Sequence, residues 1–256
     1  MGGALLRGWL AQGVSAASIV IEEPQLSPEV LLLMRQNGLV AGLAGVKGAL
    51  SMAIIAVKPQ TMEAVLPLIT PICGPDTVIV SVAAGRTLAS IERHFAPNTA
   101  VVRAMPNTPA AVGRGITGAV CNTAVTPEQK RLCDQLLSAV GEVVWVHDEA
   151  FIEAVTAISG SGPAYVFHFV EALAAAGVAL GLPPDISGKL ARATVTGAGE
   201  LLHQSPDAPS RLRENVTSPG GTTAAALAVL MAQPGLEDLL ARATAAAAKR
   251  AQELAG

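Results

Sequence analysis

The first 147 residues alternate between short runs of aliphatic residues and segments with helical periodicity, and this alternation restricts the folds open to the chain. The runs are SIVI (18–21), SMAIIAV (51–57), TVIVSV (77–82), TAVVRAM (99–105), ITGAVCN (116–122) and EVVWV (142–146). Continuous apolar strands separated by helices indicate a mostly parallel sheet covered by helices on both faces. We therefore predict a doubly wound, Rossmann-like α/β domain over residues 1–147.

The strand signals end after His147, and residues 148–256 carry helical patterns only. This half is rich in alanine and glycine, with GAG at 197–199 and small residues throughout 172–181, which allow helices to pack closely. We predict an all-α domain over residues 148–256. The fold class is thus an α/β sheet domain followed by a helical domain.

Composition excludes several classes of partner. Only 14% of the residues are charged, 51% are hydrophobic and the net charge is -3, whereas nucleic-acid binders show a clustered basic excess. Arg7 interrupts the first apolar segment, no uninterrupted apolar run reaches membrane-spanning length, and the N-terminus lacks a secretory signal pattern. We expect a cytoplasmic protein that binds neither nucleic acid nor membrane. The three cysteines and four scattered histidines lack metal-site spacing, so we expect no metal.

The expected phosphate-binding turn of such a sheet domain is missing. A G-x-G-x-x-G turn follows the first strand of dinucleotide-binding domains, but MGGALLRGWLAQG resembles the helix after that turn. If Gly2 is the last glycine of the turn, Glu22 stands where an acidic residue binds the ribose, about twenty positions on. The alternative for Glu22 is a surface residue that ends a strand. We expect that the gene product or its ancestor began about ten residues earlier.

The segment RENVTSPGGTT (213–223) places four hydroxyl side chains, a proline and two glycines before an alanine-rich helical pattern. Serine and threonine are favoured helix N-caps, and glycines let a backbone approach a ligand closely. The segment indicates a helix N-terminus that holds an anion, with an ordinary capped loop as the alternative.

Other candidate residues follow directly after predicted strands, where open α/β sheets bind their ligands. Lys58 would face either a cofactor phosphate or water, and the small residues at 82–84 indicate a tight turn. Asn107 lies between two prolines in a stiff connection, which also fits a rigid turn. Glu149 fits a first-turn helix glutamate favoured by the helix dipole.

Five motifs in order along nearly the whole chain resemble those of pyrroline-5-carboxylate reductase: AVKPQ (56–60), SVAAG (81–85), RAMPNTP (103–109), SGSGPAY (159–165) and NVTSPGGTT (215–223). That family makes proline by reducing the imine of a five-membered ring with NADPH or NADH. The resemblance implies a set of cofactor-binding residues. They are Gly2, Glu22, Ala56, Val57, Lys58, Pro59, Val82, Ala83, Ala84, Asn107 and Asn215.

The resemblance further implies that the 217–223 loop holds the carboxylate of a cyclic imino acid. Its substrate-binding residues would be Ser218, Gly220, Gly221, Thr222 and Thr223. Thr223 would hydrogen-bond the ring nitrogen, and Thr223 with Glu149 make up the implied catalytic set. A threonine hydroxyl is too weak an acid for conventional general acid catalysis, so we expect the substrate to arrive protonated.

The resemblance implies NADPH as cofactor, with NADH as the alternative because a carboxylate at Glu22 repels a 2'-phosphate. It also implies a homodimer or a higher homo-oligomer formed by the helical domain. Two other functions stay open: a non-catalytic dimerisation remnant, and a hydroxyacid dehydrogenase. The latter enzymes carry a lysine in the helix after a glycine-rich motif, whereas GSGPAYVFHFVEAL has none before Lys189.

Overall fold

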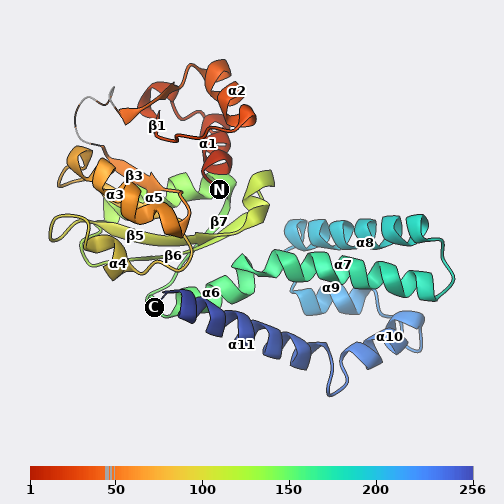
Figure 1. Ribbon diagram of the computed structural model, residues 1–256. Helices are drawn as coiled ribbons and strands as arrows, with labels where there is room; N and C mark the ends of the chain where they lie inside the picture. Colours follow the sequence, from red (N-terminus) through yellow and green to blue (C-terminus); the bar gives the residue numbers. More distant parts are fainter. Residues whose placement is uncertain (44–45, 47, 49, 256) are drawn as a thin grey trace. The chain divides into compact units, whose positions relative to one another are not determined.

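The computed structural model describes residues 1–43, 46, 48 and 50–255, and the chain divides into two compact units. Unit 1 contains residues 1–160 together with 248–256, and unit 2 contains residues 161–247 (Figure 1). The domain boundary at residue 147 stays a prediction, because a boundary between compact units and a boundary between evolutionary modules need not coincide.

The main sheet of unit 1 has the order β3-β4-β5-β6-β7. Its strands are β3 (Met52–Ile55), β4 (Val78–Ser81), β5 (Val101–Pro106), β6 (Gly115–Cys121) and β7 (Gly141–Trp145). All neighbouring pairs are parallel except β5 and β6, which are antiparallel. A parallel neighbour requires a crossover of about a dozen residues or more, and the connection from Pro106 to Gly115 is shorter. The sheet is therefore mixed.

A second, two-stranded sheet pairs β1 (Val20–Ile21) with β2 (Val40–Ala41) in parallel. Helix α2 (Pro28–Asn37) connects the two strands. The Oγ atom of Ser27 accepts a hydrogen bond from the Val30 N–H at 3.3 Å, and Gly38 ends the helix with φ 66°. Ser27 is thus the N-cap of α2, and strand β2 was not among the predicted strands.

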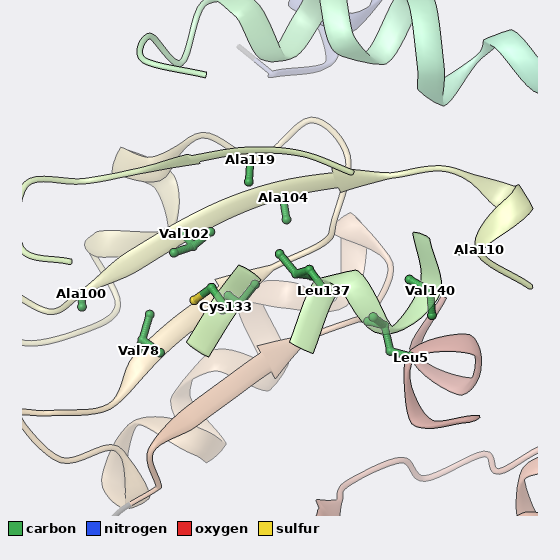
Figure 2. Packing of buried hydrophobic residues seen from close by; sticks show 11 residues of the cluster. Leu5, Val78, Ala100, Val102, Ala104, Ala110, Ala119, Cys133, Leu137 and Val140 are labelled. Carbon is green, nitrogen blue, oxygen red and sulfur yellow. The ribbon is translucent and has the colours of Figure 1, made fainter. Parts of the chain in front are cut away.

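Helices cover both faces of the main sheet. On one face, side chains of α1 (Gly2–Ala11) and α5 (Pro127–Leu137) pack against Val78, Val80 and Val102. Figure 2 shows Cys133 and Leu137 of α5 in this cluster. On the other face, α3 (Met62–Ile69) and α4 (Leu88–Glu92) pack against Ile79 and Val101. The predicted doubly wound arrangement is confirmed.

Short turns complete unit 1. Turns of 3₁₀ helix lie at Ala16–Ser18, Pro59–Thr61, Thr70–Ile72, Thr108–Val112 and Ser138–Val140. Helix α6 (Phe151–Val155) continues into a π-helical turn, Thr156–Gly160. This turn ends unit 1 before its last segment returns at residue 248.

Helix α1 is held firmly against the sheet by close backbone packing. Leu5 is completely buried, and the indole N–H of Trp9 donates to the Leu136 carbonyl at 2.8 Å. A Cβ on Gly8 would lie 2.5 Å from the Ala139 carbonyl oxygen, so only glycine permits this approach. The packing fixes where the N-terminus of α1 lies.

Unit 2 is entirely helical and leaves much apolar surface exposed. Its helices are α7 (Gly162–Ala179), α8 (Pro184–Gln204), α9 (Pro209–Asn215), α10 (Thr222–Leu230) and the first part of α11 (Leu236–Ala255). Helices α7 and α10 contain no buried residue, and Phe167 and Val229 are 63% and 73% exposed. Large exposed apolar surfaces mark interaction sites.

The helical stretch Phe151–Ala179 is long and apolar enough to cross a membrane by length and composition alone. Glu153 and Glu171 are its only charged residues besides a histidine. The expectation concerned uninterrupted apolar runs, whereas this stretch is interrupted by Glu153 and Glu171. None of the apolar window is buried within the chain, as is also true of a helix that packs against a partner protein.

Candidate functional site

The N-terminus of α1 lies beside the carboxyl end of β3. A Cβ on Gly2 would lie 3.3 Å from the Cβ of Ala56, the first residue after β3. The first N–H groups of a helix have no partner within the helix and attract anions. Gly2 and Ala56, two predicted cofactor residues, therefore lie side by side where α1 begins and β3 ends.

Glu22 follows the last residue of β1, as the spacing predicted. Its side chain is exposed, and its Oε2 accepts a hydrogen bond from the Leu43 N–H at 3.0 Å. The Gly42 N–H donates to the Ile21 carbonyl at 2.8 Å beside it. One carboxylate oxygen therefore holds the end of the small sheet, while the side chain still reaches solvent.

Two turns at the carboxyl ends of β3 and β4 contain most of the remaining predicted cofactor residues. We call residues 56–59 the 56–59 loop and residues 82–87 the 82–87 turn. In the loop, Lys58 is exposed, and its contact with a cofactor phosphate stays a prediction. The two segments are linked directly, because the Arg86 Nη2 donates to the Pro59 carbonyl at 2.7 Å.

The 82–87 turn is tight, as predicted from its small residues. The Val82 N–H donates to the Ile55 carbonyl at 3.1 Å, and the Ala83 N–H donates to the Ser81 Oγ at 3.3 Å. Ala83 is 5% exposed, whereas Ala84 is exposed. The turn therefore presents small side chains and backbone at the strand end, where a flat ring can approach.

Asn107 lies at the end of β5 with its side chain buried. Its Nδ2 donates to the Ser159 carbonyl at 3.1 Å, and its Oδ1 accepts from the Ile116 N–H at 3.0 Å. The amide thus ties the π-helical turn to β5 and β6. These contacts favour the rigid-turn alternative for its side chain, and its role as a cofactor ligand stays a prediction.

Glu149 belongs to a buried ion-pair network that was not predicted from the sequence. Its Oε1 accepts from the Arg103 Nη1 at 2.8 Å and from the Leu88 N–H at 2.8 Å. The Arg103 Nη2 donates to Glu153 at 3.2 Å, and the Arg103 side chain is 4% exposed. One sequence signal was available, since a buried charge needs a partner and Arg103 stands inside an apolar strand pattern.

The predicted substrate loop forms a type II turn that leads into α10. Pro219 and Gly220 occupy its two central positions, Gly220 has φ 68°, and the Gly221 N–H donates to the Ser218 carbonyl at 3.0 Å. Gly221 is the N-cap of α10. The Gly221 N–H is therefore already engaged, and the first-turn amides of α10 begin with Thr222.

The remaining side chains of this loop differ in exposure. Ser218 and Thr222 are exposed, and Thr223 is half-buried. Asn215, a predicted cofactor residue, is the last residue of α9 and is exposed. These residues lie in unit 2, whereas Gly2, Glu22, the 56–59 loop, the 82–87 turn, Asn107 and Glu149 lie in unit 1.

The candidate residues of both units include few groups of metal-binding type. Within the described part of the chain, no group of three or more His, Cys, Asp or Glu side chains is placed to hold a metal ion. Most candidate residues supply small side chains, hydroxyl groups or backbone amides, which suit the binding of an anion and of a flat ring.

Comparison with known proteins places this arrangement among nicotinamide-dependent oxidoreductases. Residues 149–254 match the family described as pyrroline-5-carboxylate reductase dimerisation. The chain is 40% identical over 256 residues to pyrroline-5-carboxylate reductase of Pseudomonas aeruginosa, covering 100% of this chain and 93% of that one. It is 45% identical over 201 residues to the Synechocystis enzyme of the same name, covering 78% and 74%.

Solved structures agree with this comparison. A pyrroline-5-carboxylate reductase from Coxiella burnetii superimposes with a TM-score of 0.91 at 35% identity, covering 99% of this chain and 94% of that one. Plasmodium falciparum pyrroline carboxylate reductase, solved with NADP bound, gives a TM-score of 0.78 at 26% identity, covering 100% and 95%. The chain belongs to the pyrroline-5-carboxylate reductase family.

Proposed function

We propose that this chain reduces 1-pyrroline-5-carboxylate to L-proline with a hydride from NAD(P)H. The observation that carries the proposal is the type II turn at residues 218–221, which places Ser218 directly before the N-terminus of α10. Such a turn suits a carboxylate, and proline biosynthesis follows from the family to which the chain belongs.

The residues of unit 1 fit a dinucleotide. Glycine fits best at position 2, because a Cβ there would lie 3.3 Å from the Cβ of Ala56. With no side chain at this position, the first N–H groups of α1 can bind a phosphate. The 56–59 loop and the 82–87 turn would lie along the nicotinamide half, and Glu22 beside a ribose. When bound, the nicotinamide supplies the hydride. The contribution of the chain is to orient the rings and exclude water.

The substrate carboxylate would be held by the Ser218 hydroxyl and by the N–H groups of Thr222 and Thr223, at the positive end of α10. Gly220 and Gly221 support this site by shaping the turn. Because the Gly221 N–H donates to Ser218 within the turn, we assign the carboxylate to the next amides, those of Thr222 and Thr223. A ring carboxylate placed there would set the imine beside the Thr223 side chain.

Thr223 would hydrogen-bond the ring nitrogen of the bound imine. The substrate's C=N bond becomes a C–N single bond as hydride adds to carbon, and the proton already on nitrogen remains as N–H. No protein acid is consumed in this balance. Glu149, the second implied catalytic residue, is engaged by Arg103 and Leu88, which suits a structural contribution to the site.

We propose NADPH as the preferred cofactor, supported by the NADP-bound Plasmodium falciparum relative. NADH is the alternative cofactor, since the carboxylate of Glu22 would repel the 2'-phosphate of NADPH. Arg35, on the exposed side of α2, is a cation that would favour NADPH if it reached the ribose.

We propose a homodimer, or a higher homo-oligomer, that works in the cytoplasm without nucleic acid or membrane. The exposed apolar side chains of α7 and α10 support a protein partner, and residues 149–254 match a family named for dimerisation. Burial of Phe167 and its neighbours against a second copy would account for the hydropathy of the Phe151–Ala179 stretch.

The function is tested by adding pyrroline-5-carboxylate to the purified chain with NADH or NADPH and following cofactor absorbance and proline formation. We expect oxidation of reduced cofactor in equal amount to proline formed, faster with NADPH. A chain that binds neither cofactor would support the dimerisation remnant instead. Oxidation with a hydroxyacid or ketoacid, but not with the imine, would support the dehydrogenase alternative.

A further inference from the structure

Arg103 connects the sheet to α6 from a buried position. It lies on β5 directly opposite Ser81, the last residue of β4. Its two guanidinium nitrogens bind Glu149 at 2.8 Å and Glu153 at 3.2 Å. Because a buried guanidinium with two carboxylate partners has little freedom, Glu149 is held in one place relative to the strand.

The same Glu149 oxygen reaches the end of the 82–87 turn. It accepts a hydrogen bond from the Leu88 N–H at 2.8 Å, and Leu88 is the first residue of α4. The first N–H groups of a helix have no partner within the helix. Glu149 therefore closes the far end of the turn from a separate element.

The near end of the turn is held by the sheet. Val82 donates to the Ile55 carbonyl at 3.1 Å, and Ala83 donates to the Ser81 hydroxyl at 3.3 Å. Between these bonds and Leu88, Gly85 has φ 67° and gives the backbone its bend. The shape of the turn is thus determined by contacts at both of its ends.

We propose that Arg103 and Glu149 are positioning residues, which set the geometry of the 82–87 turn through the Leu88 N–H. This inference rests on the proposed function, in which the turn lies against the nicotinamide ring. Neither side chain need touch the substrate. Loss of the Leu88 hydrogen bond should therefore weaken cofactor binding while the protonation behaviour of the reaction is retained.

The most selective test removes the N–H and no carboxylate. Leu88→Pro eliminates the donor, and proline is well tolerated at the first helical position. The preceding residue, Thr87, has φ -77° and ψ 159°, the extended conformation that a following proline requires. Leu88→Ala is the matched control, because it also loses the leucine side chain but retains the N–H.

We expect the dissociation constant for NADPH, measured by fluorescence titration without substrate, to be about 3- to 10-fold higher in Leu88→Pro than in Leu88→Ala. Equal constants in the two variants would overturn the positioning role. If the wild-type chain reduces the imine normally, that result leaves the proposed function intact. Absence of both binding and turnover in wild type would instead overturn the proposed function.

Circular dichroism shows whether Leu88→Pro folds. If it does not fold, a second pair of variants tests the same inference. Glu149→Gln retains an oxygen that accepts from Leu88, whereas Glu149→Ala removes it. We expect NADPH affinity near the wild-type value in Glu149→Gln, loss of about 3- to 10-fold or more in Glu149→Ala, and an unchanged pH profile of turnover in Glu149→Gln. If the turnover of Glu149→Gln no longer falls on one side of the pH profile, Glu149 acts as a general acid or base in the reaction. That result would overturn the inference.

Discussion

Gly2 and Ala56 approach so closely that a Cβ on Gly2 would lie 3.3 Å from the Cβ of Ala56. The two residues belong to different elements, the start of α1 and the end of β3. The sequence suggested these two residues separately, as a glycine near the N-terminus and as the end of an apolar strand. The structure places them in contact at one location. A side chain larger than a methyl group at position 2 would occupy the space beside both.

We expect Gly2→Val to weaken NADPH binding by roughly 5- to 100-fold, since overpacking of this kind costs about 1–3 kcal/mol. Gly3→Ala is the control, because a Cβ at Gly3 meets only the tip of the Val30 side chain at 3.2 Å. Fluorescence titration of both variants measures the effect. Wild-type affinity in Gly2→Val would remove the start of α1 from the cofactor site.

Thr223→Ala should lower turnover by roughly 10- to 1000-fold, the scale for losing one oriented hydrogen bond to a transition state. Cofactor affinity should be unchanged, because the residue acts on the substrate nitrogen. Thr196→Ala is a suitable control, since that exposed hydroxyl donates to the Arg192 carbonyl within α8 at 3.1 Å. Steady-state kinetics with an unaltered rate for Thr223→Ala would exclude this residue from the reaction.

Ser218→Ala should raise the Michaelis constant for the imine by roughly 10-fold with little change in turnover number, because a carboxylate anchor acts before and during the reaction. The substitution leaves the turn intact, since Gly221 bonds the Ser218 carbonyl and not its hydroxyl. Initial rates over a range of substrate concentration separate the two parameters. A loss of turnover number alone would contradict carboxylate anchoring.

Alkaline conditions should destabilise the sheet unit through Cys133. Burial raises the pKa of this thiol from 9.0 to about 12, with a smaller contribution from Cys121. Above about pH 9 the unfolded thiol ionises while the folded one does not, so stability present below that pH is lost progressively towards pH 12. Between about pH 8 and pH 10.5, wild type should lose about 2 kcal/mol more unfolding free energy than Cys133→Ala.

Urea denaturation of both proteins at the two pH values measures this difference. The two proteins differ only at residue 133, so the comparison isolates the contribution of the Cys133 thiol. Parallel losses would show that the buried thiol does not control the alkaline transition. The sign is fixed by the raised pKa, so a gain in relative stability at high pH would also contradict the assignment.

A charge on the exposed face of α7 should disrupt assembly. Phe167 is 63% exposed, and Phe167→Glu would place a carboxylate in the proposed dimer interface. Val112→Glu is the control, at a 76% exposed apolar residue of unit 1. Light scattering after size exclusion should show a smaller species for Phe167→Glu alone. Identical masses in wild type and both variants would exclude Phe167 from the interface.

Local sequence patterns predicted the strands and most helices because each depends on near neighbours. The Thr126 cap of α5, for example, accepts from the Gln129 N–H three residues away. Strand β2 was missed because Val40–Ala41 stands between Gly38 and Gly42, which interrupt the aliphatic run. The segment after Met105, described from its two prolines as a stiff connection, forms a 3₁₀ turn because prolines limit hydrogen bonding.

The turns of the candidate site could be predicted from the sequence, but the contacts between its side chains could not. Gly85 and Gly220 signal bends through composition alone, and both have positive φ. The partners of Glu149 and Asn107, by contrast, lie 46 residues away at Arg103 and 52 residues away at Ser159. No local pattern contains such pairs, so their structural roles emerge only when the sheet is assembled.

The exposed apolar surfaces of α7 and α10 affect how mutations in the gene for this chain would act. If each chain completes its hydrophobic interior only with a second copy, folding and function become properties of a pair of gene products. A cell that makes two versions of this chain would then form mixed assemblies. A version with a normal helical unit and a disabled sheet unit would occupy normal partners, so its effect on proline supply would exceed its share of the protein.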